Sequence, residues 1–426
     1  MGLFSQIFPD FQLSPAYFQI FLGFPFACLV KLRQRTPALF SALASWSLQV
    51  DRNGGRSGGA DSPAVTGNGR ATGGHRYGPD AQQDQASPYK GNQYRGTYAA
   101  LDLGTNNCRL LIARPNREGF RIVDAFSRIV RLGEGLSRSG QLSEGAIVRT
   151  LSALAVCREK MENRGVTRAR LIATEACRAA DNGGEFLARV REHVGLDLEI
   201  VDRETEAHLA AAGCTVLADK DAEAIVLFDI GGGSTEVVWL VRGDNADVSL
   251  SDRIRHWTSL PLGVVTMAEK FGGQDIDART FEDMVDFVSV ELQEFARNAA
   301  PENRCVRFHL LGTSGTVTTV AGVHLNLARY DRRRVDGLWM SGQEVDAAMN
   351  LLRGMSYEQR AQNGCIGHER ADLVLAGCAI LEAIRRAFPA DRVRIADRGL
   401  REGILMQMMA ADGVWHEWRT GRSNHP

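Results

Sequence analysis

Two short turns in this sequence combine an acidic residue with glycines, hydroxyl groups and amides. The first is "LDLGTNN" at 101–107, and the second is "FDIGGGSTE" at 228–236. Glycine lets backbone N–H groups come close to a ligand, and successive N–H groups in a tight turn form a small anion-binding concavity. Both turns are therefore suited to binding phosphate. The predicted phosphate-binding residues are Gly104, Thr105, Asn106 and Asn107 in the first turn, and Gly231, Gly232, Gly233, Ser234 and Thr235 in the second.

Three carboxylates accompany these turns, and alone they would repel phosphate. Asp102 lies in the first turn, and Asp229 and Glu236 lie in the second. A divalent cation would explain them, because Mg²⁺ is commonly held by one or two carboxylates together with substrate phosphates and water. We therefore predict that all three bind Mg²⁺. In the alternative interpretation each aspartate only caps its glycine turn, but Asp-x-Gly recurs in both turns, which argues against it.

Two further features could bind anions. "LGTSGT" at 311–316 precedes a helical pattern, and a helix N terminus attracts anions through its dipole and its free N–H groups. Its candidate residues are Gly312, Thr313 and Gly315, although a plain helix cap would use the same residue types. Arg178 follows a predicted strand in "ATEACRAADNG". It could form two parallel hydrogen bonds to phosphate, or a surface ion pair.

The elements that position these residues repeat along the chain. Apolar segments of strand length flank each turn, at 97–103 and 108–114 and again at 224–230 and 235–241, so each turn joins a hairpin. Asp102 then matches Asp229, which indicates an internal duplication of one α/β unit. We predict two similar lobes with the turns facing each other across a cleft, where ligands usually bind. The expected domains are 97–223 and 224–415, with an extension at 1–96 and a tail at 416–426.

Composition excludes several classes of protein. The chain has 426 residues and a formal net charge of −1, which gives no overall attraction to nucleic acid or to a membrane surface. Its eight cysteines form no C-x-x-C pair, so we do not expect a zinc site. Buried free thiols in a reducing compartment are the ordinary interpretation, and we expect a cytoplasmic protein.

The N-terminal extension differs from the rest of the chain. Residues 17–30 are uncharged and apolar, but this segment is shorter than the roughly 20 residues that span a bilayer, and no basic region precedes it. We expect no stable membrane insertion; a membrane-associating segment and a start codon placed too far upstream remain alternatives. Residues 51–96 contain eleven glycines and no Leu, Ile, Phe, Met or Trp, which predicts disorder.

Together these motifs resemble the exopolyphosphatase / guanosine pentaphosphate phosphohydrolase family of the actin–sugar kinase–Hsp70 superfamily. The matching stretches are "ALDLGTNNCRLLIA", "RLGEGL", "ATEACRAADNG", "RETEAHLA", "LFDIGGGSTEVV", "LGTSGT" and "ADRGLREGIL". The resemblance implies an α/β fold of two duplicated ribonuclease H-like (actin-like ATPase) lobes. It also implies Mg²⁺ and an activated water that hydrolyses a terminal phosphoanhydride bond, either of inorganic polyphosphate or at the 5′ γ-phosphate of guanosine pentaphosphate.

The same resemblance implies a catalytic base in the segment "DRETEAHL". Glu206 aligns with the family's base, and Glu204 is the alternative. Three neighbours of the base depart from the family pattern, namely Arg203, Thr205 and His208. Without the resemblance, Glu206 would be interpreted as an exposed acid in the first turn of a helix, favoured there by the helix dipole.

Other functions share parts of this pattern. An ATP-dependent kinase or chaperone-like ATPase of the same superfamily would use the same phosphate turns, but it also needs an adenosine pocket. A non-catalytic sensor of a phosphorylated alarmone would need the donors but gain little from the acids. The chain ends soon after "ADRGLREGIL", so it resembles the short, two-lobed family members, and we expect less processive action on long polymers and a possible homodimer.

Overall fold

The computed structural model describes residues 96–117, 119–243, 249–303 and 307–415. All of them belong to the compact unit that runs from Tyr89 to Pro426. The apolar N-terminal segment, the predicted disorder up to residue 95 and the tail at 416–426 lie outside the described residues. Within the described part, no helix is long and apolar enough to cross a membrane.

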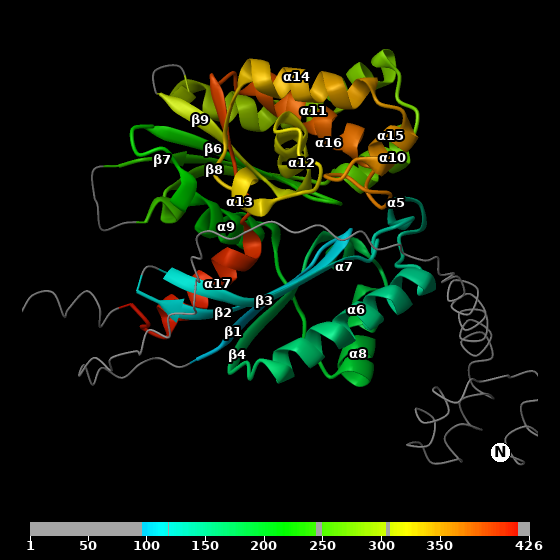
Figure 1. The fold of residues 1–426 in the computed structure, drawn as a ribbon, viewed down its shortest axis with the longest axis vertical. Coiled ribbons are helices and arrows are strands. Elements are labelled where there is room, and N and C mark those ends of the chain that lie inside the picture. The colour runs from blue at the N-terminus through cyan, green and yellow to red at the C-terminus, as the bar shows by residue number, and fades with distance from the viewer. Residues whose placement is uncertain (1–95, 118, 244–248, 304–306, 416–426) are drawn as a thin grey trace, which may run out of the picture. The chain divides into compact units, whose positions relative to one another are not determined.

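The first lobe is built on a five-stranded sheet in the order β3-β2-β1-β4-β5 (Figure 1). β1 pairs antiparallel with β2, and β2 pairs antiparallel with β3, whereas β4 is parallel to both β1 and β5. The predicted first hairpin is therefore present. The strands are β1 (Tyr98–Leu103), β2 (Asn107–Asn116), β3 (Gly119–Ile129), β4 (Arg168–Ala173) and β5 (Glu199–Ile200).

Four helices belong to this lobe. α6 begins after Ser143, whose hydroxyl accepts a hydrogen bond from the Ala146 N–H at 3.3 Å, and it buries one apolar face against the sheet. The remaining helices follow β3 and β4. Their bounds are α5 (Leu136–Ser139), α6 (Glu144–Asn163), α7 (Glu175–Ala179) and α8 (Gly183–Val194).

The second lobe is built on a six-stranded sheet in the order β10-β11-β9-β6-β7-β8. Its strands are β6 (Ala224–Ile230), β7 (Thr235–Val241), β8 (Ile254–Leu260), β9 (Phe308–Thr313), β10 (Trp339–Ser341) and β11 (Arg392–Ile395). Its helices are α10 (Val264–Phe271), α11 (Ala278–Asn303), α12 (Ser314–His324), α13 (Arg332–Val335), α14 (Gly342–Gly354), α15 (Tyr357–Gln362) and α16 (Val374–Ala387). The core contains Trp239 packed against Phe308 and Phe388.

The two sheets repeat one arrangement. β6 pairs antiparallel with β7 and parallel with β9, as β1 does with β2 and β4. The hairpins also end alike, because the Gly104 N–H donates to the Asn107 carbonyl at 2.9 Å and the Gly231 N–H donates to the Ser234 carbonyl at 2.9 Å. The predicted α/β fold with two duplicated actin-like lobes is confirmed.

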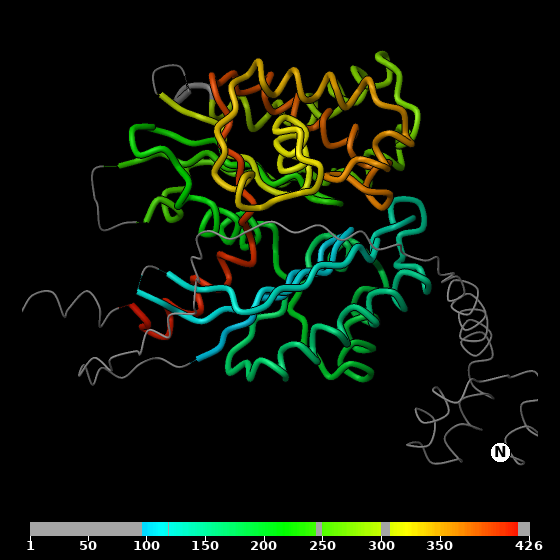
Figure 2. Tube along the Cα trace, viewed as in Figure 1, coloured from blue at the N-terminus to red at the C-terminus, as the bar shows by residue number. Residues whose placement is uncertain are grey.

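Two helices connect the lobes, α9 (Arg203–Cys214) and α17 (Leu400–Ala411). α9 follows the first lobe in the chain, yet it packs against the second sheet; α17 follows the second lobe, yet it packs against β1 and β2. Figure 2 shows the red C-terminal end of the described chain beside the blue first strand. The sequence placed residues 399–410 in the second lobe by chain order, and packing assigns them to the first sheet as well.

Candidate active site

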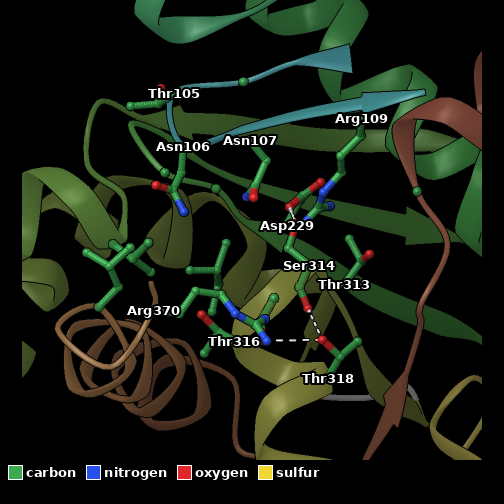
Figure 3. Close-up of a pocket in the computed structure, with 18 of the residues that line it drawn as sticks. Thr105, Asn106, Asn107, Arg109, Asp229, Thr313, Ser314, Thr316, Thr318 and Arg370 are labelled. Atoms are coloured by element: carbon green, nitrogen blue, oxygen red, sulfur yellow. Dashed lines mark hydrogen bonds between the residues drawn. The ribbon is translucent and has the colours of Figure 1, made fainter. Parts of the chain in front are cut away.

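A cavity of about 900 Å³ lies between the two hairpin turns and is lined by both lobes (Figure 3). Most of the predicted site residues line it. They are Asp102, Gly104, Thr105, Asn106, Asn107, Glu206, Asp229, Gly231, Gly232, Gly233, Ser234, Glu236, Thr313 and Gly315. Sequence reasoning thus placed residues from four separate segments in one hollow.

Three predicted phosphate-binding residues do not line the cavity: Thr235, Gly312 and Arg178. The Thr235 hydroxyl instead donates to the Leu262 carbonyl at 2.9 Å, so it fixes the first residue of β7. A side chain at Gly312 would collide with the Phe228 ring at 2.5 Å, so this glycine permits close packing of β9 on β6. Both residues thus have a packing role in the second lobe, at β7 and at the contact between β9 and β6.

The two turns touch each other. A Cβ atom on Gly233 would lie 2.5 Å from the Thr105 hydroxyl, and one on Gly232 would lie 3.1 Å from the Asn106 nitrogen. Any side chain at these positions would therefore push the lobes apart. The glycines let the donors of both turns face the same cavity.

Four of the carboxylates that line this cavity lie beside the two turns, and burial raises the pKa of each: Asp102, Glu206, Asp229 and Glu236. Burial raises the pKa of Asp102, although the positive charge of Arg109 partly offsets this rise. Burial also raises the pKa of Asp229, although a hydrogen bond from the Ser314 hydroxyl partly offsets it. Burial and the charge of Asp229 raise the pKa of Glu236 to about 7. Burial and the charge of Glu236 raise the pKa of Glu206 well above its ordinary value.

This donor set fits a hard divalent cation that substrate helps to hold. Asp229 and Glu236 are direct cross-strand partners on β6 and β7, and oxygen ligands are what Mg²⁺ prefers. Among the described residues, no group of three or more His, Cys, Asp or Glu side chains could hold a metal by itself. One or two carboxylates completed by phosphate oxygens and water is the usual manner of Mg²⁺ binding.

Several arginines that the sequence prediction did not name also line the cavity, and three of them are Arg109 on β2, Arg370 before α16 and Arg401 on α17. Arg109 is the cross-strand partner of Asp102 in the first hairpin, just as Glu236 is the cross-strand partner of Asp229 in the second. The first lobe therefore has an arginine where the second has a glutamate. Figure 3 shows Arg109 and Arg370 on opposite walls. Within the described residues, no carboxylate accepts a hydrogen bond from any of the three. Arg370 donates to the Ile366 and Cys365 carbonyls, at 3.1 and 2.9 Å, so its charge is not paired with an acid by these bonds.

The third glycine turn meets the second. Ser314, at the start of α12, has a left-handed backbone with φ of 78°, and its hydroxyl donates to Asp229. Non-glycine residues rarely adopt this conformation, and it recurs at functional sites. The Thr313 hydroxyl donates to the Arg398 carbonyl at 2.6 Å, so it orients the segment before α17.

Arg178 lies in an ion-pair network beside the cavity. Its guanidinium donates to Glu175, to the Val201 carbonyl at 2.6 Å and to Glu206 at 3.1 Å. Glu175 and Glu206 line the cavity, whereas Arg178 does not. Arg203, one of the departures from the family pattern, donates to Glu175 at 2.9 Å. The predicted candidate base is thus joined to a network that the sequence did not reveal.

Two duplicated lobes around a cleft lined by glycine turns define an actin-like two-lobed fold. The chain belongs to the Ppx/GppA phosphatase family, whose pattern matches residues 111–412. The Aquifex aeolicus member of this family has a solved structure that is 28% identical, with a TM-score of 0.61, over 74% of this chain and 98% of that one. An exopolyphosphatase from Cytophaga hutchinsonii shares the fold, with a TM-score of 0.66 at 21% identity, over 74% of this chain and 98% of that one.

A curated relative combines this region with more sequence. A bifunctional 3-dehydroquinate synthase/phosphatase from Fusobacterium nucleatum is 26% identical over 334 residues. The match covers 75% of this chain and 47% of that protein, so the chain spans about half the length of this relative.

Proposed function

We propose that this protein is a Mg²⁺-dependent phosphoanhydride hydrolase. It would release terminal phosphate from inorganic polyphosphate or the 5′ γ-phosphate from guanosine pentaphosphate. The observation that carries the proposal is the cavity itself, in which Asp102, Asp229, Glu236 and Glu206 lie beside two touching glycine turns. Family membership supports a phosphatase, and the acids are more than an anion-binding sensor needs.

The chain's own groups divide the work of binding. The amides and hydroxyls of the two turns would hold the terminal phosphate, and Arg109, Arg370 and Arg401 would pair with the phosphates that follow it. Asp229 and Glu236, with help from Asp102, would hold Mg²⁺, which when bound neutralises charge on the phosphate oxygens. Positioning and charge neutralisation account for most of the rate in this class of reaction.

Glu206 would act as the general base. Its carboxylate lines the cavity, and its raised pKa makes it a better proton acceptor than an exposed glutamate. It would take a proton from the water that attacks the terminal phosphorus in line with the bond that breaks. Glu204, the alternative base, does not line the cavity.

One feature of the cavity favours a nucleotide as substrate. Ile366, Leu373 and Val374 contribute apolar side chains to its wall. A base and ribose could contact such a wall, whereas polyphosphate has no apolar part. We therefore expect guanosine pentaphosphate to bind more tightly than a polyphosphate of similar charge.

The test is phosphate release from each substrate, with Mg²⁺ or with EDTA. We expect release only with Mg²⁺, and a fall of roughly 10²–10⁴-fold in Glu206→Gln. Glu204→Gln is the matched variant from the same helical turn, and it should keep its rate. Binding of guanosine pentaphosphate without release would instead support a sensor. ATP turnover without either substrate would support a kinase or ATPase of the same fold.

A further inference from the structure

We propose that Glu175 and Arg178 are positioning residues that hold Glu206 in its working orientation, and that Arg178 does not bind substrate phosphate. The inference rests on the proposed function, because it assigns Glu206 the role of base. It replaces the expectation that Arg178 grips phosphate. Most N–H groups of the Arg178 guanidinium already donate hydrogen bonds to other groups of the protein.

Arg178 uses most of its hydrogen-bonding capacity inside the protein. Nε and Nη2 donate to the Glu175 carboxylate at 3.0 and 2.6 Å, Nη1 donates to the Val201 carbonyl at 2.6 Å, and Nη2 donates to Glu206 at 3.1 Å. A guanidinium has five N–H donors, so one remains. Phosphate recognition by arginine normally uses two parallel donors, which this geometry does not offer.

Glu175 keeps Arg178 in place. Its side chain is 10% exposed. Oε2 accepts both bonds from Arg178 and a longer one from Arg203 at 3.3 Å, and Oε1 accepts from Arg203 at 2.9 Å. Arg203 is the first residue of α9, three positions before Glu206. The carboxylate therefore joins the short helix α7 to the start of the helix that carries the base.

The consequence for Glu206 is a fixed carboxylate with one oxygen left for chemistry. Oε2 accepts from Arg178 at 3.1 Å, and within the described residues no other hydrogen bond reaches the carboxylate. The charged groups that face it are Arg178 and Glu175 from α7, Asp102 from β1 and Glu236 from β7. Arg178 is thus the cation that both orients Glu206 and offsets the negative charges around it.

A phosphate-binding role would require Arg178 to leave two carboxylates. Both side chains are largely buried, with 18% exposure for Arg178 and 10% for Glu175. Breaking a buried ion pair leaves charges without partners, which is strongly unfavourable. Arg109 and Arg401 on the cavity wall donate to no carboxylate within the described residues, so they could pair with phosphate without this cost.

The first experiment separates positioning from binding by steady-state kinetics on the full chain with guanosine pentaphosphate. In Arg178→Met we expect kcat to fall about 10- to 100-fold, because a base displaced by about 1 Å loses that much rate. KM should stay within about twofold, as expected when ground-state binding is untouched. The acid limb of the pH–rate profile should move to higher pH, since Arg178 lowers the pKa of Glu206. An unchanged kcat with a KM raised tenfold or more would overturn the inference.

Glu175→Gln provides a second variant in which Arg178 keeps its charge. In Glu175→Gln we expect kcat to fall less than in Arg178→Met, with an unchanged KM. In Arg178→Lys we expect a kcat between those of Arg178→Met and the wild-type protein. Thermal melting of each variant checks that it folds. If Arg178→Met does not fold, the same kcat and KM comparison on Glu175→Gln and Arg178→Lys decides the question.

A double-mutant cycle gives the sharpest test. If Arg178 acts through Glu206, adding Arg178→Met to Glu206→Gln should cost nothing further, because the group it positions is already gone. Multiplicative losses would overturn the inference while the proposed function stands. No phosphate release by the wild-type protein from either substrate would overturn the proposed function and this inference together.

Discussion

Glu236 is a buried carboxylate of the candidate site whose charge is expected to lower the stability of the folded protein. It is 3% exposed and faces Asp229 across the β6–β7 hairpin, and the Ser259 hydroxyl donates to it at 2.8 Å. A buried carboxylate next to another lacks the solvation it had in the unfolded chain. Without a bound cation, the two charges therefore oppose folding.

Glu236→Gln should separate stability from activity. The change keeps the side-chain volume and removes one of two repelling charges, so in EDTA the free energy of unfolding should rise by about 1 kcal/mol and the Tm by about 2–4 °C. Phosphate release with Mg²⁺ should fall about 100-fold. Thermal melting and phosphate assays measure both. A lower Tm in EDTA would contradict this account of the acidic pair.

Residue types alone predicted part of this site. The acids and glycines of the two turns are adjacent in the sequence, so their chemistry is visible there. Arg109, Arg370 and Arg401 come from three distant segments and meet only through the fold. Aligning the duplicated hairpins would have shown Arg109 opposite Asp102, and Arg401 lies in the motif "ADRGLREGIL", but no motif marks Arg370. The contacts of Arg178 depend on how α7 approaches α9, which its neighbours in the sequence do not show.

At the scale of elements, the junction of α9 and α17 depends on glycine. A Cβ atom on Gly403 would lie 2.0 Å from the Leu209 carbonyl oxygen, and one on Gly213 would lie 2.0 Å from that of Gly399. Backbone atoms cannot move aside as a flexible side chain can. The two helices can therefore approach this closely only because both glycines lack a side chain.

Gly403→Ala should loosen this junction. Although alanine favours helix, the added methyl group overpacks the contact, and we expect a loss of about 1–3 kcal/mol in the free energy of unfolding. Gly145→Ala on the exposed side of α6 is the matched control, because its Cβ would come no nearer than 3.6 Å to Arg149. The control should be neutral or slightly stabilising. Urea unfolding measures both, and equal midpoints for the two variants would contradict the prediction.

The sequence predicted the two hairpins, and it did so for a physical reason. Their strands are apolar segments joined by short polar turns, a pattern that follows from burying the strands. α17 shows the limit: its residues belong to the predicted second domain by chain order, but nothing in their sequence tells which sheet the helix will cover. That is decided by the glycine contacts with α9, which join residues far apart in the chain.

At the scale of the whole described unit, polar contacts also join the lobes at the segment "RLGEGL". Arg131 donates to Asp372 at 2.9 Å and to the Glu369 carbonyl at 3.0 Å. Glu269 on α10 accepts from the Gly135 N–H at 2.7 Å and from the Ser137 hydroxyl. These contacts hold the lobes together near Glu369 and Arg370 on the cavity wall.

Removing these contacts should open the cleft. In Arg131→Met/Glu269→Ala we expect KM to rise about threefold, because the closed, binding-competent form is less populated. Spin labels at Val148 and Leu351, exposed positions on α6 and α14, would report a longer distance between the lobes, after Cys28 and Cys305 are replaced by serine. Glu282→Gln, which breaks an ion pair within the second lobe, is the control. An unchanged label distance would contradict the prediction.

The expected cytoplasmic location and the expected homodimer stay predictions.

The exchange of α9 and α17 has a consequence for how this chain acquires its structure. Each sheet is covered partly by a helix that the other half of the polypeptide supplies. If the gene were divided between residues 223 and 224, each fragment would leave an apolar surface bare, and neither would be a self-sufficient folding unit. The two halves should therefore fold as one cooperative unit. The cavity between them should form only after α17 has been synthesised.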